Sequence, residues 1–173
     1  MWLKLLGSLL IIFAGTSIGC SFANRCSERP KQIRHILNCL ASLRSYINYA
    51  AIPLPEALKL CTNSTEGVIR DLFEGMSGIL ERTGWITPKD AMLQAIALFE
   101  KNMALDKPEL EMLVLLGANL GTADHTEQEK FLSMIQSELE KIEQNAIKLR
   151  DQNVKLYRYL GICGSLAVII CLV

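Results

Sequence analysis

The chain has 173 residues, of which 50% are hydrophobic and 21% are charged, and its formal net charge at pH 7 is zero. A protein that binds nucleic acid through its phosphates needs a clear excess of basic residues, so the composition argues against that class. The length and the positive mean hydropathy allow one ordinary domain with hydrophobic segments at its ends.

The first hydrophobic segment predicts a membrane helix at residues 1–24. A stretch of 20 residues beginning at Leu5 carries no charge, which is about the length needed to cross a bilayer core. Gly15 and Gly19 have the spacing that lets another membrane helix approach closely, although scattered small residues are an equally simple interpretation. Two alternatives to a retained anchor are a cleaved signal peptide and a lipoprotein signal ending at Cys20.

Basic residues flank the hydrophobic ends, and we call these two groups the collars. The N-terminal collar is Arg25, Arg29, Lys31 and Arg34, and the C-terminal collar is Lys148, Arg150, Lys155 and Arg158. Residues 35–147 hold 9 basic against 16 acidic side chains, a net charge of −7. Because basic residues near a membrane segment stay in the cytoplasm, residues 25–158 are predicted to form a cytoplasmic helical bundle in contact with membrane lipid. Residues 159–173 are predicted to be a short second membrane helix, with a helix buried in a partner as the alternative.

The apolar residues recur in steps of three and four, and no segment alternates with period two, so the sequence predicts an all-α fold of about six helices. The first helix is expected to start near Pro30 and to end before Pro53. Pro55 opens a short second helix. The polar stretch Thr62–Thr65 offers N-caps for a third helix, whose apolar residues begin at Val68.

Two further helices begin at prolines. Thr87 is a predicted N-cap that precedes Pro88, and Pro108 opens the fifth helix. The fifth helix is expected to stop at Gly117 or Gly121.

The longest predicted helix starts at Asp124, where the cap carboxylate and Glu127 form a capping-box pattern. No glycine or proline interrupts residues 124–158, so this segment would be a rod of roughly 50 Å. It leads directly into the second hydrophobic segment.

No catalytic, metal or cofactor site is predicted. His35 and His125 are far apart in sequence and have no nearby nucleophile, and no Gly-rich phosphate loop is present. Cys39 and Cys61 lie on predicted helices without metal-ligand spacing, so they are interpreted as small buried hydrophobic residues. The pattern therefore predicts neither an enzyme nor a receptor for a small-molecule substrate.

The acidic body is predicted to present carboxylates to a basic patch on a partner. The candidates lie near one helix–helix connection, and the prediction places them away from the collars: Glu100, Asp106, Glu109 and Glu111. The simpler alternative is that they are solvated loop charges.

Four motifs, in order, resemble those of the stage III sporulation protein AB family. They are LKLLG at 3–7, ERPKQIR at 28–34, PLPEAL at 53–58 and LGxxLGxxDxxxQ at 116–128. The resemblance implies a domain similar to the cytoplasmic domain of the type II secretion platform protein F. It also implies a scaffold role during engulfed-forespore development. The scaffold would belong to the channel complex of the mother-cell membrane facing the forespore, and it would dock the secretion-type ATPase of that complex.

Two other functional classes stay open on the residues alone. A ligand-binding or catalytic bundle would need a buried polar cluster. A membrane-anchored or lipid-anchored helical module outside the cytoplasm would be revealed by processing at Cys20.

Overall fold

The computed structural model describes residues 27–47, 52–121 and 125–172, with side chains up to Gln152. These residues contain six α-helices and no strand, which confirms the all-α prediction. Residues 31–144 form one compact unit, which we call the body, and the described residues 27–30 and 145–172 belong to a second unit. The predicted domain boundaries at residues 25 and 158 stay predictions.

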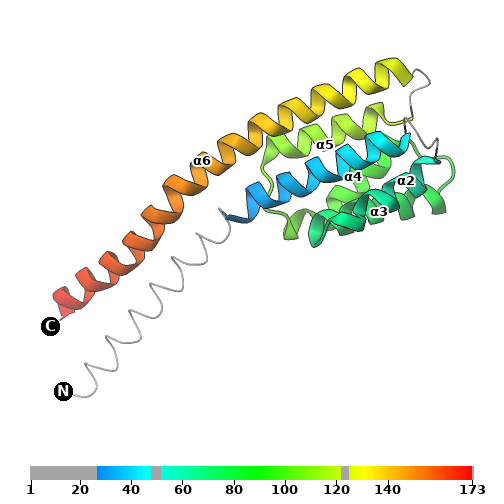
Figure 1. Cartoon of the computed structure of the whole chain (residues 1–173). Coiled ribbons are helices and arrows are strands. Elements are labelled where there is room, and N and C mark those ends of the chain that lie inside the picture. The colour runs from blue at the N-terminus through cyan, green and yellow to red at the C-terminus, as the bar shows by residue number, and fades with distance from the viewer. Residues whose placement is uncertain (1–26, 48–51, 122–124, 173) are drawn as a thin grey trace. The chain divides into compact units, whose positions relative to one another are not determined.

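Figure 1 shows the order of the helices along the chain. A first helix over residues 27–47 is followed by α2 (Leu54–Cys61), the 3-10 helix η2 (Thr62–Ser64), α3 (Val68–Arg82), α4 (Pro88–Phe99), the 3-10 helix η3 (Glu100–Asn102), α5 (Lys107–Asn119) and α6 (His125–Leu172). The first helix is already formed at Ser27, three residues before the predicted start at Pro30.

The start of α4 follows the predicted chemistry. The Asp90 backbone N–H donates to the Thr87 hydroxyl oxygen at 3.1 Å, and Pro88 occupies the first helical position. A proline is tolerated there because the first backbone N–H groups of a helix have no partner within the helix. Thr87 therefore caps α4 as predicted.

The start of α3 differs from the prediction, because Thr62–Ser64 form η2 and supply no N-cap. The Thr62 hydroxyl donates backward to the Lys59 carbonyl oxygen at 2.7 Å, at the end of α2. The residue before α3 is Gly67, whose φ of 72° lies in the left-handed region that glycine adopts without a steric cost. A backbone conformation, and no side-chain cap, thus sets the start of α3.

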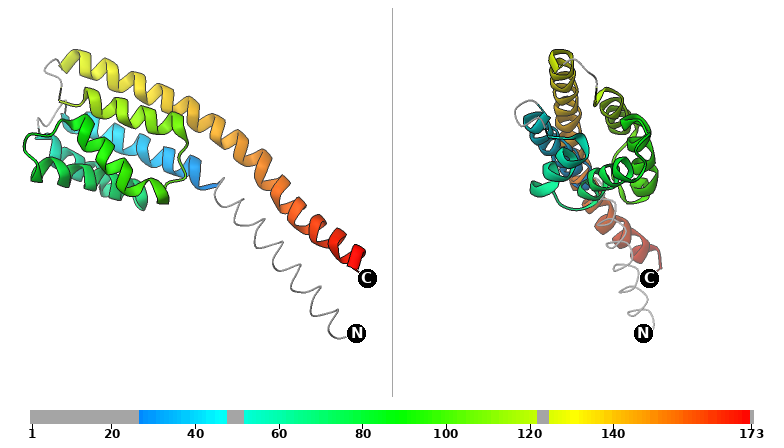
Figure 2. Two further views of the ribbon diagram at one scale, coloured as in Figure 1. Left: turned by 180° about the vertical axis from the view of Figure 1, so that it is seen from behind. Right: turned by 90° about the vertical axis from the view of Figure 1, so that its right-hand side faces the viewer.

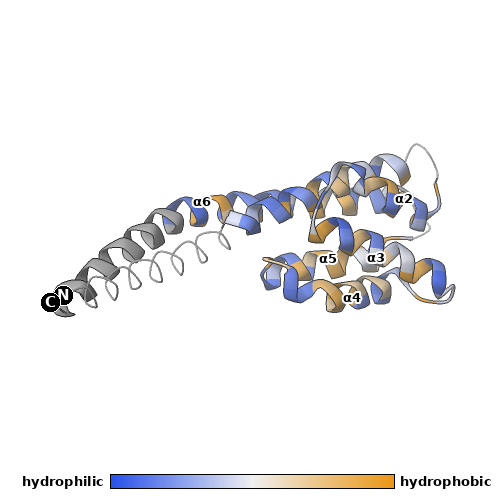
Figure 3. Ribbon diagram, turned by 90° about the horizontal axis from the view of Figure 1, so that it is seen from below, coloured by the Kyte–Doolittle hydropathy of each residue, from blue (hydrophilic) through white to orange (hydrophobic). Residues whose placement is uncertain are grey.

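The core of the body forms where consecutive helices pack together. α2 packs on α3, α3 on α4, and α4 on α5 (Figure 2). Hydrophobic and hydrophilic residues both occur along α4 and α5 (Figure 3). The largest fully buried side chains are Phe73, Ile33, Ile36, Leu40, Leu43, Leu58, Ile69, Leu72, Met76, Met92, Leu113 and Leu116.

The predicted membrane segments stay predictions. Residues 1–24, with Gly15 and Gly19, lie outside the described part of the chain. Over residues 159–172 α6 continues as helix, but side chains are not described there. Among the residues that the structure describes, no helix is long and apolar enough to cross a membrane.

Candidate functional site

The connection between α4 and α5 carries three of the four predicted docking carboxylates on its surface. Glu100 lies in η3, Asp106 directly precedes α5, and Glu111 lies on α5, and all three are exposed. Lys101 and Lys107 are exposed beside them. The connection is therefore a mixed surface with a small excess of negative charge.

Glu109, the fourth predicted docking carboxylate, is fully buried. The Asp106 backbone N–H donates to Glu109 Oε2 at 3.0 Å, and the Asp106 side chain accepts from the Glu109 backbone N–H. This reciprocal capping box satisfies two donors at the start of α5 that would otherwise lack partners. Glu109 therefore positions α5 and is not available to a partner, which corrects its assignment as a docking residue.

The connection between α4 and α5 lies beside the N-terminal collar. The prediction from the sequence placed it away from the collars. The Ala104 backbone N–H donates to Gln32 Oε1 at 2.8 Å across 72 residues of chain. Gln32 lies between the collar residues Lys31 and Arg34 on the first helix. The surface of this connection therefore lies at the end of the body that contains Lys31, its first residue.

The two ends of the body meet at an ion pair between the first helix and α6. Arg34 Nε donates to Glu143 Oε1 at 2.5 Å. The Glu143 side chain is only 8% exposed, whereas that of Arg34 is 61% exposed. A buried carboxylate needs such a partner, because burying an unpaired charge is costly. The two partners lie 109 residues apart in the chain, so sequence spacing does not reveal the pairing.

A second ion pair fixes the relative direction of the same two helices. Arg44 Nη2 donates to Glu129 Oε1 at 2.7 Å. Since position 34 pairs with 143 and position 44 with 129, the first helix and α6 run antiparallel. Residues 31 and 144 therefore lie at the same end of the body.

The remaining predicted sites stay predictions. Lys148 is exposed, Arg150 donates to Asp151 Oδ1, and Glu127 is exposed in the first turn of α6. Asp124, the predicted cap of α6, lies outside the described residues. So do the side chains of the collar residues Arg25, Lys155 and Arg158.

The two described cysteines are buried and free, as predicted. Cys39 Sγ lies 3.2 Å from Thr65 Oγ1, and the Cys61 thiol donates to the Leu58 carbonyl oxygen at 3.1 Å. The hydrogen bond with Cys39, together with burial, raises the pKa of the Cys61 thiol. Cys61 therefore stays protonated and unreactive at neutral pH.

No metal-binding cluster of His, Cys, Asp or Glu occurs within the described residues. His35 is half-buried on the first helix, and its Nδ1 has no hydrogen-bond partner there. A lone imidazole without a nearby nucleophile does not form a catalytic arrangement.

Comparisons with known proteins agree on one family. The family model described as Stage III sporulation protein AB matches residues 4–173. The chain is 32% identical over 170 residues to the Stage III sporulation protein AB of Bacillus subtilis (strain 168), and the match covers 98% of this chain and 99% of the relative. A solved structure of Stage III sporulation protein AB (SpoIIIAB) has a TM-score of 0.68 at 30% identity and covers 72% of this chain and 98% of that chain.

Proposed function

The chain belongs to the stage III sporulation protein AB family, which gives it a role in sporulation, and from this premise we propose that it is a non-enzymatic membrane scaffold. The scaffold would serve the secretion-like channel complex of the mother-cell membrane facing the forespore. Its body would lie in the cytoplasm, anchored by membrane helices at 1–24 and 159–173.

The observation that carries this proposal is the meeting of the two ends of the body. Arg34 and Glu143 join the first helix to α6 where both helices continue toward the predicted anchors. Two anchors that leave a domain at one point can enter the same membrane without crossing the domain. The basic collars that start at this end favour contact with anionic headgroups and retention in the cytoplasm.

We propose that the body docks the secretion-type ATPase of the complex through the exposed carboxylates Glu100, Asp106 and Glu111. All three are accessible, and a basic patch on the ATPase would be their electrostatic complement. Lys101 and Lys107 reduce the net charge of this surface, so the contribution of charge to affinity is expected to be modest.

A binding titration of the full chain in nanodiscs against the purified ATPase tests the docking surface. The triple variant Glu100→Gln, Asp106→Asn and Glu111→Gln should weaken binding, and the loss should shrink as salt rises, because the screening length falls from about 10 Å at 0.1 M to about 3 Å at 1 M. Asparagine is chosen at position 106 because it caps helices as well as aspartate does. Glu109 is left unchanged.

The matched control removes three exposed carboxylates elsewhere on the body, at Glu66, Glu138 and Glu140. It should leave the affinity for the ATPase near that of the unchanged chain. Equal losses in both triple variants would show that net charge, and not this surface, determines binding.

Topology is tested separately with reporters placed after Asn102, which is exposed in η3. A reporter active only in the cytoplasm should work there, and one active only outside should be silent. The reverse result would place the body outside the cytoplasm and exclude the ATPase as its partner.

A further inference from the structure

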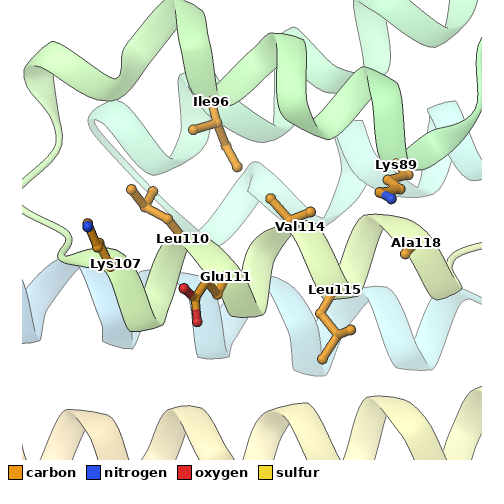
Figure 4. A pocket seen from close by; sticks show the side chains of 8 residues that line it. All are labelled: Lys89, Ile96, Lys107, Leu110, Glu111, Val114, Leu115 and Ala118. Atoms are coloured by element: carbon orange, nitrogen blue, oxygen red, sulfur yellow. The ribbon is translucent and has the colours of Figure 1, made fainter.

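An open, apolar groove runs between α4 and α5 on the surface of the body (Figure 4). Its volume is about 400 Å³, and it is lined by Lys89, Ile96, Lys107, Leu110, Glu111, Val114, Leu115 and Ala118. The lining comes mostly from one side of α5, with Ile96 of α4 reaching toward it. The groove therefore offers a row of aliphatic side chains to a partner.

Part of this apolar surface is open to solvent. Leu115 on the lining is 36% exposed, and Leu93, one turn before Ile96 on α4, is 42% exposed. Trp85 is fully exposed in the turn before α4. Exposed leucine side chains beside an apolar groove are typical of protein–protein contact sites.

Charge distinguishes the two ends of the groove from its middle. Lys107 lies at one end, and Lys89 lies at the other (Figure 4). A Cβ on Gly117 would lie 3.3 Å from the Lys89 Cα, so Lys89 is level with the last turn of α5. Ten residues of helix separate positions 107 and 117, which corresponds to about 15 Å. Glu111 is the one acidic residue between them.

The lining thus carries a net positive charge in a segment, 35–147, whose net charge is −7. An acidic occupant is therefore favoured at this groove. Both walls are α-helices whose backbone groups are already hydrogen-bonded along their middle turns, so the groove has no strand edge to pair with an extended peptide. A helix fits, because its ridge of apolar side chains can lie between two helices.

We propose that the α4–α5 groove binds an amphipathic helix of a partner protein, about three turns long, with an apolar ridge and carboxylates near both ends that pair with Lys89 and Lys107. This surface adjoins the ATPase-docking surface proposed above and shares Glu111 and Lys107 with it. There the chain supplies carboxylates, whereas here it supplies the lysines.

The test uses two fluorescent helical peptides with the same leucine ridge and the full chain in nanodiscs. One peptide carries glutamates spaced about 15 Å apart at the ends of the ridge, and the other carries lysines at those positions. The glutamate peptide should bind about tenfold more tightly, which is the effect expected from two exposed ion pairs. Equal affinities, or no binding by either peptide, would overturn the proposal.

Charge reversal locates the site. The double variant Lys89→Glu with Lys107→Glu should invert the preference and favour the lysine peptide. The control reverses two exposed lysines of α6, Lys130→Glu with Lys141→Glu, and should keep the preference for glutamate. Inversion in the control as well would show that the peptides respond to total charge, which would overturn the assignment to the groove.

The apolar part is tested with Leu115→Asp, which should abolish binding of both peptides. Its control is Leu98→Asp, because Leu98 is 68% exposed on α4 and does not line the groove. Circular dichroism verifies that both variants keep their helical content. If the unchanged chain forms dimers in sedimentation, and Leu115→Asp dissociates them, the occupant is a second copy and the proposal of a partner helix fails.

Discussion

Gly117 lies where α5 packs closely against α4, and replacing it with alanine has two opposing effects on the free energy of unfolding. A Cβ at this position would lie 2.8 Å from the Met92 Cβ and 3.1 Å from the Pro88 carbonyl oxygen. Carbon atoms prefer a separation of about 3.5–4.0 Å. The neighbouring atoms are backbone atoms and a Cβ, none of which can move by a change of rotamer, so the two helices must separate.

The magnitude follows from two terms. Alanine is favoured over glycine inside a helix by roughly 0.5–1 kcal/mol. Forcing an extra carbon into a packed contact costs roughly 1–3 kcal/mol, and a rigid contact lies in the upper part of that range. Gly117→Ala should therefore lower the free energy of unfolding by about 1–2 kcal/mol.

Gly78→Ala is the matched control, because Gly78 lies in the middle of α3 and its Cβ would meet no heavy atom within 4 Å. It should raise the free energy of unfolding by about 0.5–1 kcal/mol. Denaturant unfolding of the full chain in mild detergent, followed by circular dichroism, measures both values. If Gly117→Ala stabilises the chain as much as Gly78→Ala does, the close approach of α4 and α5 is wrong.

Three other perturbations test the helix junction, the long helix and the cysteines. Arg34→Ala should lower the free energy of unfolding by about 1–3 kcal/mol, because it leaves the Glu143 carboxylate buried without its partner. Glu143→Leu should lower it less, because it removes the buried charge itself. Equal losses for the two variants in chemical denaturation would contradict this reasoning. Asp124→Ala should cost roughly 0.5–2 kcal/mol if this residue caps α6, and an unchanged unfolding curve would mean that it does not. Cys39 and Cys61 should resist alkylation in the folded chain and react after unfolding, as mass-spectrometric mapping would show, and rapid labelling of either in the native state would contradict their burial.

The helices themselves were predictable because each carries its own signal. Spacing in threes and fours identifies one buried face, and prolines at the starts of α2, α4 and α5 locate those starts within a residue or two. The start of α3 was not predictable from side chains. It depends on the positive φ of Gly67. Glycine adopts positive and negative φ about equally well, so the sequence alone does not give the sign of φ at this position.

The candidate site was less predictable, because its properties depend on contacts between distant segments. Glu109 and Glu111 are two residues apart in similar polar surroundings, yet one is buried in a capping box and the other is exposed. The burial of Glu143 depends on Arg34, which lies 109 residues away in sequence. The spacing of apolar residues identifies the face of a helix that packs on the core. It does not identify the charged side chain of another helix that will pair with a residue on that face.

The junction between the first helix and α6 also has a mechanical consequence. Because the ends of the body lie together, tension that pulls residues 31 and 144 apart acts first on the pair of Arg34 and Glu143 and then on the contacts behind it. Such a load separates two antiparallel helices from one end, and it also reaches the α4–α5 connection through the hydrogen bond between Ala104 and Gln32. When both ends are pulled in the same direction, neither the pair of Arg34 and Glu143 nor the pair of Arg44 and Glu129 is stretched, and the body moves as one piece.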